Sequence, residues 1–294
     1  MFKGSIVALV TPFSAGKVDE KSYVELIEWH IEQGTHGIVP CGTTGESATL
    51  TFEEHKRVVE LCVNTVDKRI PVIAGAGSNS TAEATILTKY AADAGADAAL
   101  LVSPYYNKPT QEGLYRHYMT IASSVSLPFF IYNVPGRTAM AVSPETIARL
   151  STHENIIGVK DAVGNLSHTS NVIGLCGDDF TVLSGDDFLT FPMMAIGGKG
   201  VISVSANIVP NKISAMTDAF YAGEWDRAKE LHYETQDLSS AMFIESNPIP
   251  VKTALALMGK INGELRLPLC EMSQMNNEKL QAVLRKMSLL DKPL

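Results

Sequence analysis

Residues 128–160 read PFFIYNVPGRTAMAVSPETIARLSTHENIIGVK and contain one complete strand–helix–strand unit. The runs at 128–133 and 156–160 are short and almost continuously apolar, which is typical of parallel strands buried on both faces. Between them, Ser143 and Pro144 suit the N-cap and the first turn of a helix. The stretch therefore predicts a β-α-β unit whose two strands lie in one parallel sheet.

The same alternation of apolar runs and amphipathic stretches continues along most of the chain. Eight strands are expected, at 5–10, 37–41, 71–75, 98–103, 128–133, 156–160, 181–185 and 200–205. Helices are expected at 19–33, 52–65, 80–94, 111–124, 143–151, 166–176, 187–196 and 210–222. Eight such units predict a (β/α)8 TIM barrel. An open doubly wound sheet is the alternative, but no G-x-G-x-x-G motif follows the first strand.

No further strand is expected after about residue 223. Three helices are expected there, at 224–243, 249–259 and 276–289, with breaks at the prolines of NPIP (247–250) and Leu267-Pro268. We therefore divide the chain into a barrel domain, 1–223, and a C-terminal helical extension, 224–294. Within the barrel, Ser80 and Glu83 have the spacing of a capping box.

The composition is that of an ordinary globular protein, with 45% hydrophobic and 19% charged residues among 294. A formal net charge of −8 disfavours binding to nucleic acid or to an anionic membrane. No stretch approaches the ~20 apolar residues that cross a bilayer, and MFKGSIVALVTPF lacks the cleavage site of a signal peptide. The four cysteines form no C-x-x-C pair, so we expect reduced thiols in a cytoplasmic protein.

Catalytic groups of a barrel lie at the C-terminal ends of its strands, so polar residues there are the first candidates for chemistry. Lys160 ends the sixth strand, where burial would lower its pKa from about 10.4 and give a nucleophilic amine. Tyr132 ends the fifth strand, where a phenol can transfer protons. Taken singly, a lysine that reaches the solvent and an ordinary packed tyrosine are the alternatives.

Two loops at the same end of the predicted barrel are suited to anions. CGTTGES (41–47) follows the second strand and offers N–H and hydroxyl donors for a carboxylate. Arg137 follows the fifth strand and suits a second carboxylate. An ordinary turn and a surface arginine are the alternatives for each alone, but the coincidence of these groups with Lys160 and Tyr132 favours a site.

Metal and cofactor chemistry is not expected. The histidines are not expected to gather with carboxylates at strand ends, which disfavours a metal-dependent enzyme. No Walker loop and no Ser-His-Asp pattern can be placed, so no cofactor is expected. The histidines are His30, His36, His55, His117, His153, His168 and His232.

Six motifs occur in one order along the chain: GTTGES (42–47), PYYN (104–107), YNVPGRT (132–138), GVKDAVGN (158–165), SGDD (184–187) and NPIPVK (247–252). With them the chain resembles, from end to end, the pyruvate-dependent Schiff-base aldolases and among these the dihydrodipicolinate synthases. YNVPGRT and NPIPVK are the most specific pieces. The related neuraminate lyases and keto-deoxy-sugar aldolases share the lysine, the tyrosine and the Gly-Thr loop, so the arginine marks the synthases.

The resemblance implies an enzyme with two small acidic substrates. Lys160 would condense with the keto carbon of pyruvate, and the resulting enamine would attack the aldehyde of L-aspartate 4-semialdehyde. Ring closure would release the lysine and give 4-hydroxy-tetrahydrodipicolinate, on the way to diaminopimelate and lysine. Tyr132 would be the acid and base, hydrogen-bonded to Thr43, and Tyr106 would extend the proton relay from across a dimer interface.

The resemblance also implies binding residues and an assembly. Thr44 and the neighbouring N–H groups would hold the pyruvate carboxylate, and Arg137 would hold the carboxylate of the semialdehyde. The main chain at Gly185 and Ile202 would line the pocket. The implied assembly is a homodimer or a homotetramer built as a dimer of dimers.

Some family members bind lysine as a feedback inhibitor at that interface. The matching positions are Ser47, Ala48, His55, Asn79, Glu83 and Tyr105. Phe52 stands where many inhibited members carry a histidine, so we expect a lysine site that is weakened. A polar dimer rim without lysine binding is the alternative.

Three other functions remain open at this point. The first is an aldolase or lyase of the same family that acts on a sugar acid, of the N-acetylneuraminate lyase or keto-deoxygluconate aldolase type. The second is a non-catalytic barrel that binds small acids, which an intact Lys160, Tyr132 and Thr43 disfavour. A metal-dependent barrel enzyme is a distant third.

Overall fold

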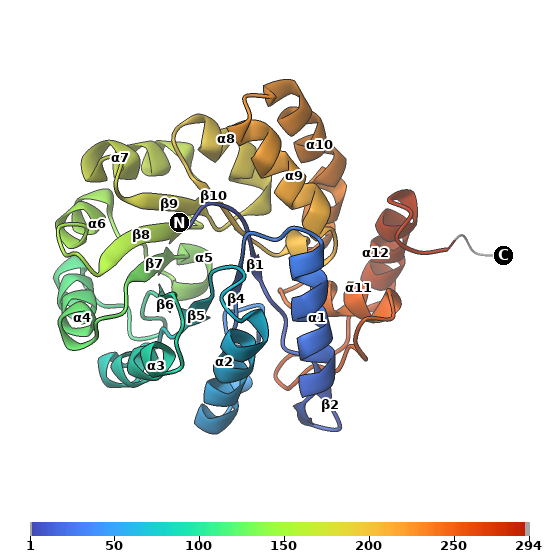
Figure 1. Ribbon diagram of the computed structural model, residues 1–294, viewed down its shortest axis with the longest axis horizontal. Coiled ribbons are helices and arrows are strands. Elements are labelled where there is room, and N and C mark those ends of the chain that lie inside the picture. The colour runs from blue at the N-terminus through green and yellow to red at the C-terminus, as the bar shows by residue number, and fades with distance from the viewer. Residues whose placement is uncertain (1, 292–294) are drawn as a thin grey trace.

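The computed structural model describes residues 2–291 as a parallel β-barrel surrounded by helices (Figure 1). Its eight strands pair in the order β4-β1-β10-β9-β8-β7-β6-β5, and a parallel bridge between Ile38 and Val72 joins the two ends of that order. The predicted (β/α)8 fold is confirmed. The strands are β1 Gly4–Ala8, β4 Gly37–Val39, β5 Ile73–Gly75, β6 Ala98–Val102, β7 Phe129–Asn133, β8 Ile156–Asp161, β9 Thr181–Ser184 and β10 Gly200–Ser203.

Helices cover the outside of the barrel (Figure 1). They are α1 Glu20–Glu32, α2 Phe52–Val66, α3 Thr81–Asp93, α4 Gln111–Ser124, α6 Pro144–Leu150, α7 Leu166–Cys176, α8 Thr190–Ala195 and α9 Pro210–Tyr221. The helix expected at 187–196 is divided into a 3-10 turn, Asp187–Leu189, and α8. Pro192 explains this, because a proline lacks the N–H of a helix interior and fits only the first turn.

Short elements between these were not foreseen. β2 Phe13–Ser14 and β3 Lys17–Val18 form a small antiparallel hairpin after β1. The loop after β7 contains a single helical turn, α5 Pro135–Thr138, with a proline at its start. Two further 3-10 turns lie at Ser47–Thr49 and Ser205–Asn207. Elements of two to four residues are too short to show a hydrophobic period.

The helix caps are partly as predicted. Ser143 caps α6 by accepting a hydrogen bond from the Thr146 N–H, with Pro144 at the first position. Ser80 likewise caps α3, but the capping box predicted there is wrong, because the Glu83 carboxylate accepts from Ser78 Oγ instead. The reciprocal box in this part of the chain belongs to Thr51 and Glu54 at the start of α2.

Strand alternation divides the buried residues into two layers. Val7, Ile131 and Val159 belong to the layer between the strands and the helices. Ile6 and Tyr132 belong to the layer inside the barrel, because successive side chains of a strand point to opposite faces. Lys160 follows Val159 and pairs in register with Tyr132, so its side chain points into the barrel.

The C-terminal extension consists of α10 Trp225–Ala241, α11 Ile249–Leu257 and α12 Gln274–Lys286. α10 packs along α9, and α12 packs against both α10 and α11 (Figure 1). The segment before α11 returns to the barrel mouth, where Asn247 hydrogen-bonds Thr44. The division at residue 223 stays a prediction. Across residues 2–291 every helix is too short or too polar to span a bilayer.

Candidate active site

Lys160 and Tyr132 face each other at the bottom of a cavity in the barrel mouth. They are register partners on β8 and β7, and Lys160 Nζ lies 4.2 Å from the centroid of the Tyr132 ring. Both residues are buried, with exposed fractions of 5% and 8%. This barrel cavity has a volume of about 490 Å³. A buried amine beside a phenol in a cavity of this size can react with a small carbonyl compound.

Gly185, at the C-terminal end of β9, leaves space for the lysine. A Cβ at this position would lie 3.1 Å from Lys160 Cε and 2.7 Å from the Cβ of Ala162. Gly185 also lies in the wall of the barrel cavity, next to the lysine stem. Ile202 lies in the layer inside the barrel but is not one of the residues that line the cavity, whereas Val204 is.

Thr43 and Thr44 belong to a tight turn after β4. Thr44 is buried, and its Oγ1 accepts a hydrogen bond of 2.9 Å from Asn247 Nδ2. Both threonines line the barrel cavity together with Tyr132. In residues 2–291 no hydrogen bond joins the Thr43 and Tyr132 side chains, so the predicted link between them stays a prediction.

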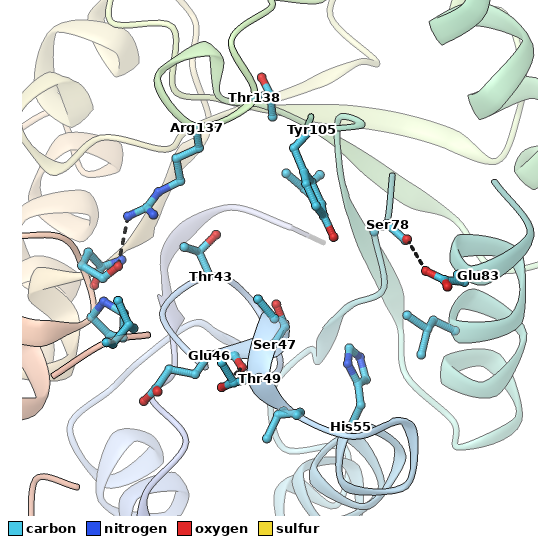
Figure 2. A pocket seen from close by; sticks show the side chains of 18 of the residues that line it. Thr43, Glu46, Ser47, Thr49, His55, Ser78, Glu83, Tyr105, Arg137 and Thr138 are labelled. Carbon is cyan, nitrogen blue, oxygen red and sulfur yellow. Dashed lines mark hydrogen bonds between the residues drawn. The ribbon is translucent and has the colours of Figure 1, made fainter. Parts of the chain in front are cut away.

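Arg137 lies in α5, at the edge of the same cavity. Its Nη2 donates a hydrogen bond of 3.0 Å to the carbonyl oxygen of Asn247 (Figure 2). The guanidinium keeps other N–H groups for an anionic substrate, because an arginine has five donors. Arg137, Thr43 and Asn247 line both this cavity and a second one beside it.

The second cavity, which we call the side cavity, has a volume of about 450 Å³ and lies between the 43–49 turn and the start of α3 (Figure 2). Phe52 lines this cavity. So do five of the six predicted lysine-site residues, namely Ser47, Ala48, His55, Glu83 and Tyr105. The sixth, Asn79, does not line the side cavity but donates a hydrogen bond to the carbonyl of Tyr105, which does.

The charged side chain that α3 contributes to the side cavity is a carboxylate. Glu83 presents a carboxylate that accepts a hydrogen bond of 2.7 Å from Ser78 Oγ. His55 bonds the Gly75 carbonyl through Nε2, and burial lowers its pKa, so its ring is neutral near pH 7. The side cavity can therefore receive an amino group at Glu83.

Tyr106 is the predicted catalytic residue that this chain does not bring to the site. It is 91% exposed and lines neither cavity, unlike Tyr105. Its φ of 70° is unusual for a bulky residue. Within one subunit, the predicted proton relay would therefore lack its third member.

Among the described residues, one histidine meets a carboxylate at a strand end without forming a larger cluster. His168 meets a carboxylate at a strand end, with its Nδ1 3.3 Å from Asp161 Oδ2. Asp161 follows Lys160 and points to the opposite side of β8, away from the cavity, so sequence spacing alone did not show this pair. In residues 2–291 no group of three or more His, Cys, Asp or Glu side chains is placed to hold a metal ion.

Two cavity residues were missed as site residues. Asp186 lines the barrel cavity, and burial raises the pKa of its carboxyl group. Asn247 joins Thr44 and Arg137 from a segment more than a hundred residues away. Their motifs, SGDD and NPIPVK, were the available signal, but a motif does not show which side chain reaches the cavity.

This chain is similar to known proteins over nearly its whole length. A model of the dihydrodipicolinate synthetase family matches residues 1–287. A relative from Thermodesulfovibrio yellowstonii, named 4-hydroxy-tetrahydrodipicolinate synthase, is 61% identical over 290 residues, which cover 99% of this chain and 100% of the relative.

Two solved structures add bound ligands. The dihydrodipicolinate synthase of Acinetobacter baumannii, complexed with pyruvate, is 48% identical, with a TM-score of 0.97 over 99% of this chain and 100% of that chain. The enzyme of Cyanidioschyzon merolae, with lysine bound, is 39% identical, with a TM-score of 0.95 over 98% and 99%. With the whole-chain family match and the 61% relative, they show that this chain belongs to the dihydrodipicolinate synthetase family.

Proposed function

We propose that this protein is a 4-hydroxy-tetrahydrodipicolinate synthase, which condenses pyruvate with L-aspartate 4-semialdehyde through a Schiff base on Lys160. The observation that carries the proposal is a buried lysine amine that faces a tyrosine ring in the cavity of the barrel mouth. Family membership and the names of full-length relatives support the choice of reaction. They do not favour the alternative, an aldolase or lyase that acts on a sugar acid.

In the first step, the amine of Lys160 attacks the keto carbon of pyruvate. Loss of water gives an imine, and loss of a proton from the methyl group gives an enamine. Thr44 and the N–H groups around it hold the pyruvate carboxylate, because a turn with several donors suits an anion. Tyr132 stands next to Nζ and exchanges the protons of these steps.

In the second step, the enamine carbon attacks the aldehyde of the semialdehyde. Arg137 holds the carboxylate of this substrate at the mouth of the cavity. The amino group of the semialdehyde then attacks the imine carbon, which closes the ring and releases Lys160 as a free amine. All groups for these steps are side chains or main-chain groups of the protein.

The proton relay requires a second copy of the chain. Tyr106 is exposed, so it is free to reach the cavity of a partner subunit. We infer a homodimer in which each subunit supplies Tyr106 to the other, with Thr43 between Tyr106 and Tyr132. Two such dimers form the expected tetramer, and the expected location is the cytoplasm.

We infer that the side cavity binds lysine as a regulator. Glu83 suits an ammonium group, and the structure of a 39% identical relative contains lysine. Phe52 lines this cavity, and its phenyl ring has no hydrogen-bonding group for the ligand, so we expect it to weaken the site. Titration calorimetry should detect L-lysine at millimolar concentration, and no heat of binding would contradict the inference.

Borohydride trapping tests the reaction. The protein is incubated with pyruvate and borohydride, digested and mapped by mass spectrometry. We expect a pyruvate-derived mass gain on the peptide that contains Lys160, and none in Lys160→Met. Labelling of no lysine, or of another lysine, would contradict the mechanism. Activity with aspartate semialdehyde, and none with N-acetylneuraminate or keto-deoxygluconate, identifies the second substrate.

A further inference from the structure

We propose that Lys252 and Glu46 are positioning residues of the active site, because their buried ion pair fixes the turn that carries Thr43 and Thr44. The proposal rests on the proposed function, since that function assigns the pyruvate carboxylate to this turn. Neither residue points into the barrel cavity or touches the reacting atoms. Lys252 lies in the first turn of α11, so the C-terminal extension would shape a binding element of the barrel.

The ion pair is completely buried. Lys252 Nζ lies 2.5 Å from Glu46 Oε1, and neither side chain has exposed surface. The ammonium also donates a hydrogen bond of 3.0 Å to the Thr11 carbonyl and lies 4.3 Å from the centroid of the Phe13 ring. The other carboxylate oxygen, Oε2, accepts a hydrogen bond from the Arg266 N–H.

Glu46 is part of the turn through its main chain. Its N–H donates to the Thr43 carbonyl, and its φ of 53° lies in the left-handed region, which costs energy for a residue with a side chain. Figure 2 shows its side chain directed away from His55 and Glu83, on the other side of the turn. An anchor on the carboxylate therefore holds the unusual backbone conformation next to Thr43 and Thr44.

The same segment fastens the two proposed carboxylate-binding groups. Asn247, five residues before Lys252, donates to Thr44 Oγ1 and accepts from Arg137 Nη2. Asn247 and Lys252 thus contact the threonine turn at Thr44 and at Glu46. Asn247 also contacts Arg137. A substrate must be held within about 1 Å of its reactive position, so anchors of this kind act on binding and rate.

Stability alone does not explain the pair. A buried ion pair rarely stabilises a fold more than apolar side chains of the same size would, because both charges lose their hydration. Burial indeed lowers the pKa of Lys252, although Glu46 opposes this effect. Removal of one partner leaves a buried charge and destabilises the fold, whereas removal of both charges does not. A variant without both charges therefore tests the positioning role of the pair separately from its effect on stability.

The experiment compares Lys252→Met with the double variant Glu46→Gln/Lys252→Met. The pyruvate concentration for half-maximal borohydride labelling of Lys160 is measured together with the melting temperature. We expect Lys252→Met to melt earlier and to need about 10- to 100-fold more pyruvate. The double variant should regain most of the melting temperature but keep the pyruvate defect, and the KM for aspartate semialdehyde should change much less.

Leu280→Ala in α12 is the matched control. Leu280 is completely buried in the same extension, so its truncation lowers the melting temperature without a contact to the turn. We expect its pyruvate dependence to equal that of the wild type. If Lys252→Met does not fold, the double variant carries the test.

Two results would overturn the proposal while leaving the reaction intact. One is wild-type pyruvate dependence in the double variant. The other is a pyruvate defect of the same size in Leu280→Ala, which would make it a general effect of lower stability. Failure of wild-type protein to be labelled on Lys160 would instead overturn the proposed function itself.

Discussion

At the scale of single residues, the site depends on space as much as on chemical groups. Lys160 can extend into the barrel cavity because position 185 has no side chain. The backbone of Gly185 is not in the left-handed region, so alanine is allowed there by its conformation. Crowding of Lys160 and Ala162 is therefore the main effect that a methyl group would have.

Gly185→Ala should slow the reaction of Lys160 without unfolding the protein. The new methyl group would contact Lys160 Cε at about 3.1 Å and displace the amine from its place beside Tyr132. We expect the rate of borohydride trapping with pyruvate to fall about tenfold or more. Gly174→Ala in α7, where a Cβ meets nothing within 4 Å, is the control. Equal trapping rates in the two variants would contradict this role of Gly185.

The sequence allowed some of these residues to be predicted and not others. Lys160 and Tyr132 could be placed because each lies at the C-terminal end of an apolar strand, and barrel topology brings such ends together. Asn247 could not be placed, because its contacts with Thr44 and Arg137 join distant segments. Tyr106 was assigned to the site only by family resemblance, and its place there depends on a second subunit.

At the scale of elements, one histidine of α7 connects the end of β8 to the loop that follows β7. His168 Nδ1 contacts Asp161 Oδ2, and His168 Nε2 lies 3.3 Å from the Val142 carbonyl. Asp161 also accepts a hydrogen bond of 2.7 Å from Thr169 Oγ1. The hydrogen bond to Asp161 is the main reason that the pKa of His168 is raised, and the charge of Glu145 adds to it.

This contact should make stability depend on pH. Because the folded pKa of His168 is raised, its stabilisation is complete below the unfolded pKa of about 6.5 and is lost as pH rises through the folded value. His168→Asn should therefore lower the free energy of unfolding by about 1 kcal/mol more at roughly pH 5.5 than at roughly pH 8.5. Urea unfolding at both pH values measures the difference.

Thr169→Val is the control for this prediction. It removes a hydrogen bond to the same carboxylate, but the threonine hydroxyl does not titrate, so its cost should be similar at the two pH values. A His168→Asn cost that does not change with pH, or that grows toward high pH, would show that the charged pair does not stabilise the fold.

Elements were predicted well where they are long and periodic. The helices at 111–124 and 166–176 match α4 and α7 in full. The strand predicted at 37–41 ends at Val39, because Cys41 has a φ of 53° and already belongs to the following turn. The capping box at Ser80 failed because Ser78, two residues earlier, competes for the Glu83 carboxylate.

At the scale of the whole molecule, eight repeats were enough to predict a closed barrel, but not how the C-terminal extension meets it. Closure follows from the number of β-α units and the right-handed crossing of parallel strands. The ion pair of Lys252 with Glu46 joins positions 206 residues apart and has no local signal. The same holds for a subunit interface, which depends on the surface of a second chain.

The inferred dimer can be tested by mixing two inactive subunits. Tyr106→Phe lacks the proposed relay group and Lys160→Met lacks the nucleophile, so each variant alone should have little activity. In a mixed dimer, one site would combine Lys160 of one chain with Tyr106 of the other and would be complete. Random mixing of equal amounts makes about half of the dimers mixed. Each mixed dimer has one complete site out of two, so the mixture should have about a quarter of wild-type activity. Co-expression with two different affinity tags and tandem purification gives assemblies that contain both chains, and a mixture of the separately purified variants is the control. If these are isolated and remain inactive while Tyr106→Phe alone is impaired, Tyr106 does not act in the partner's site.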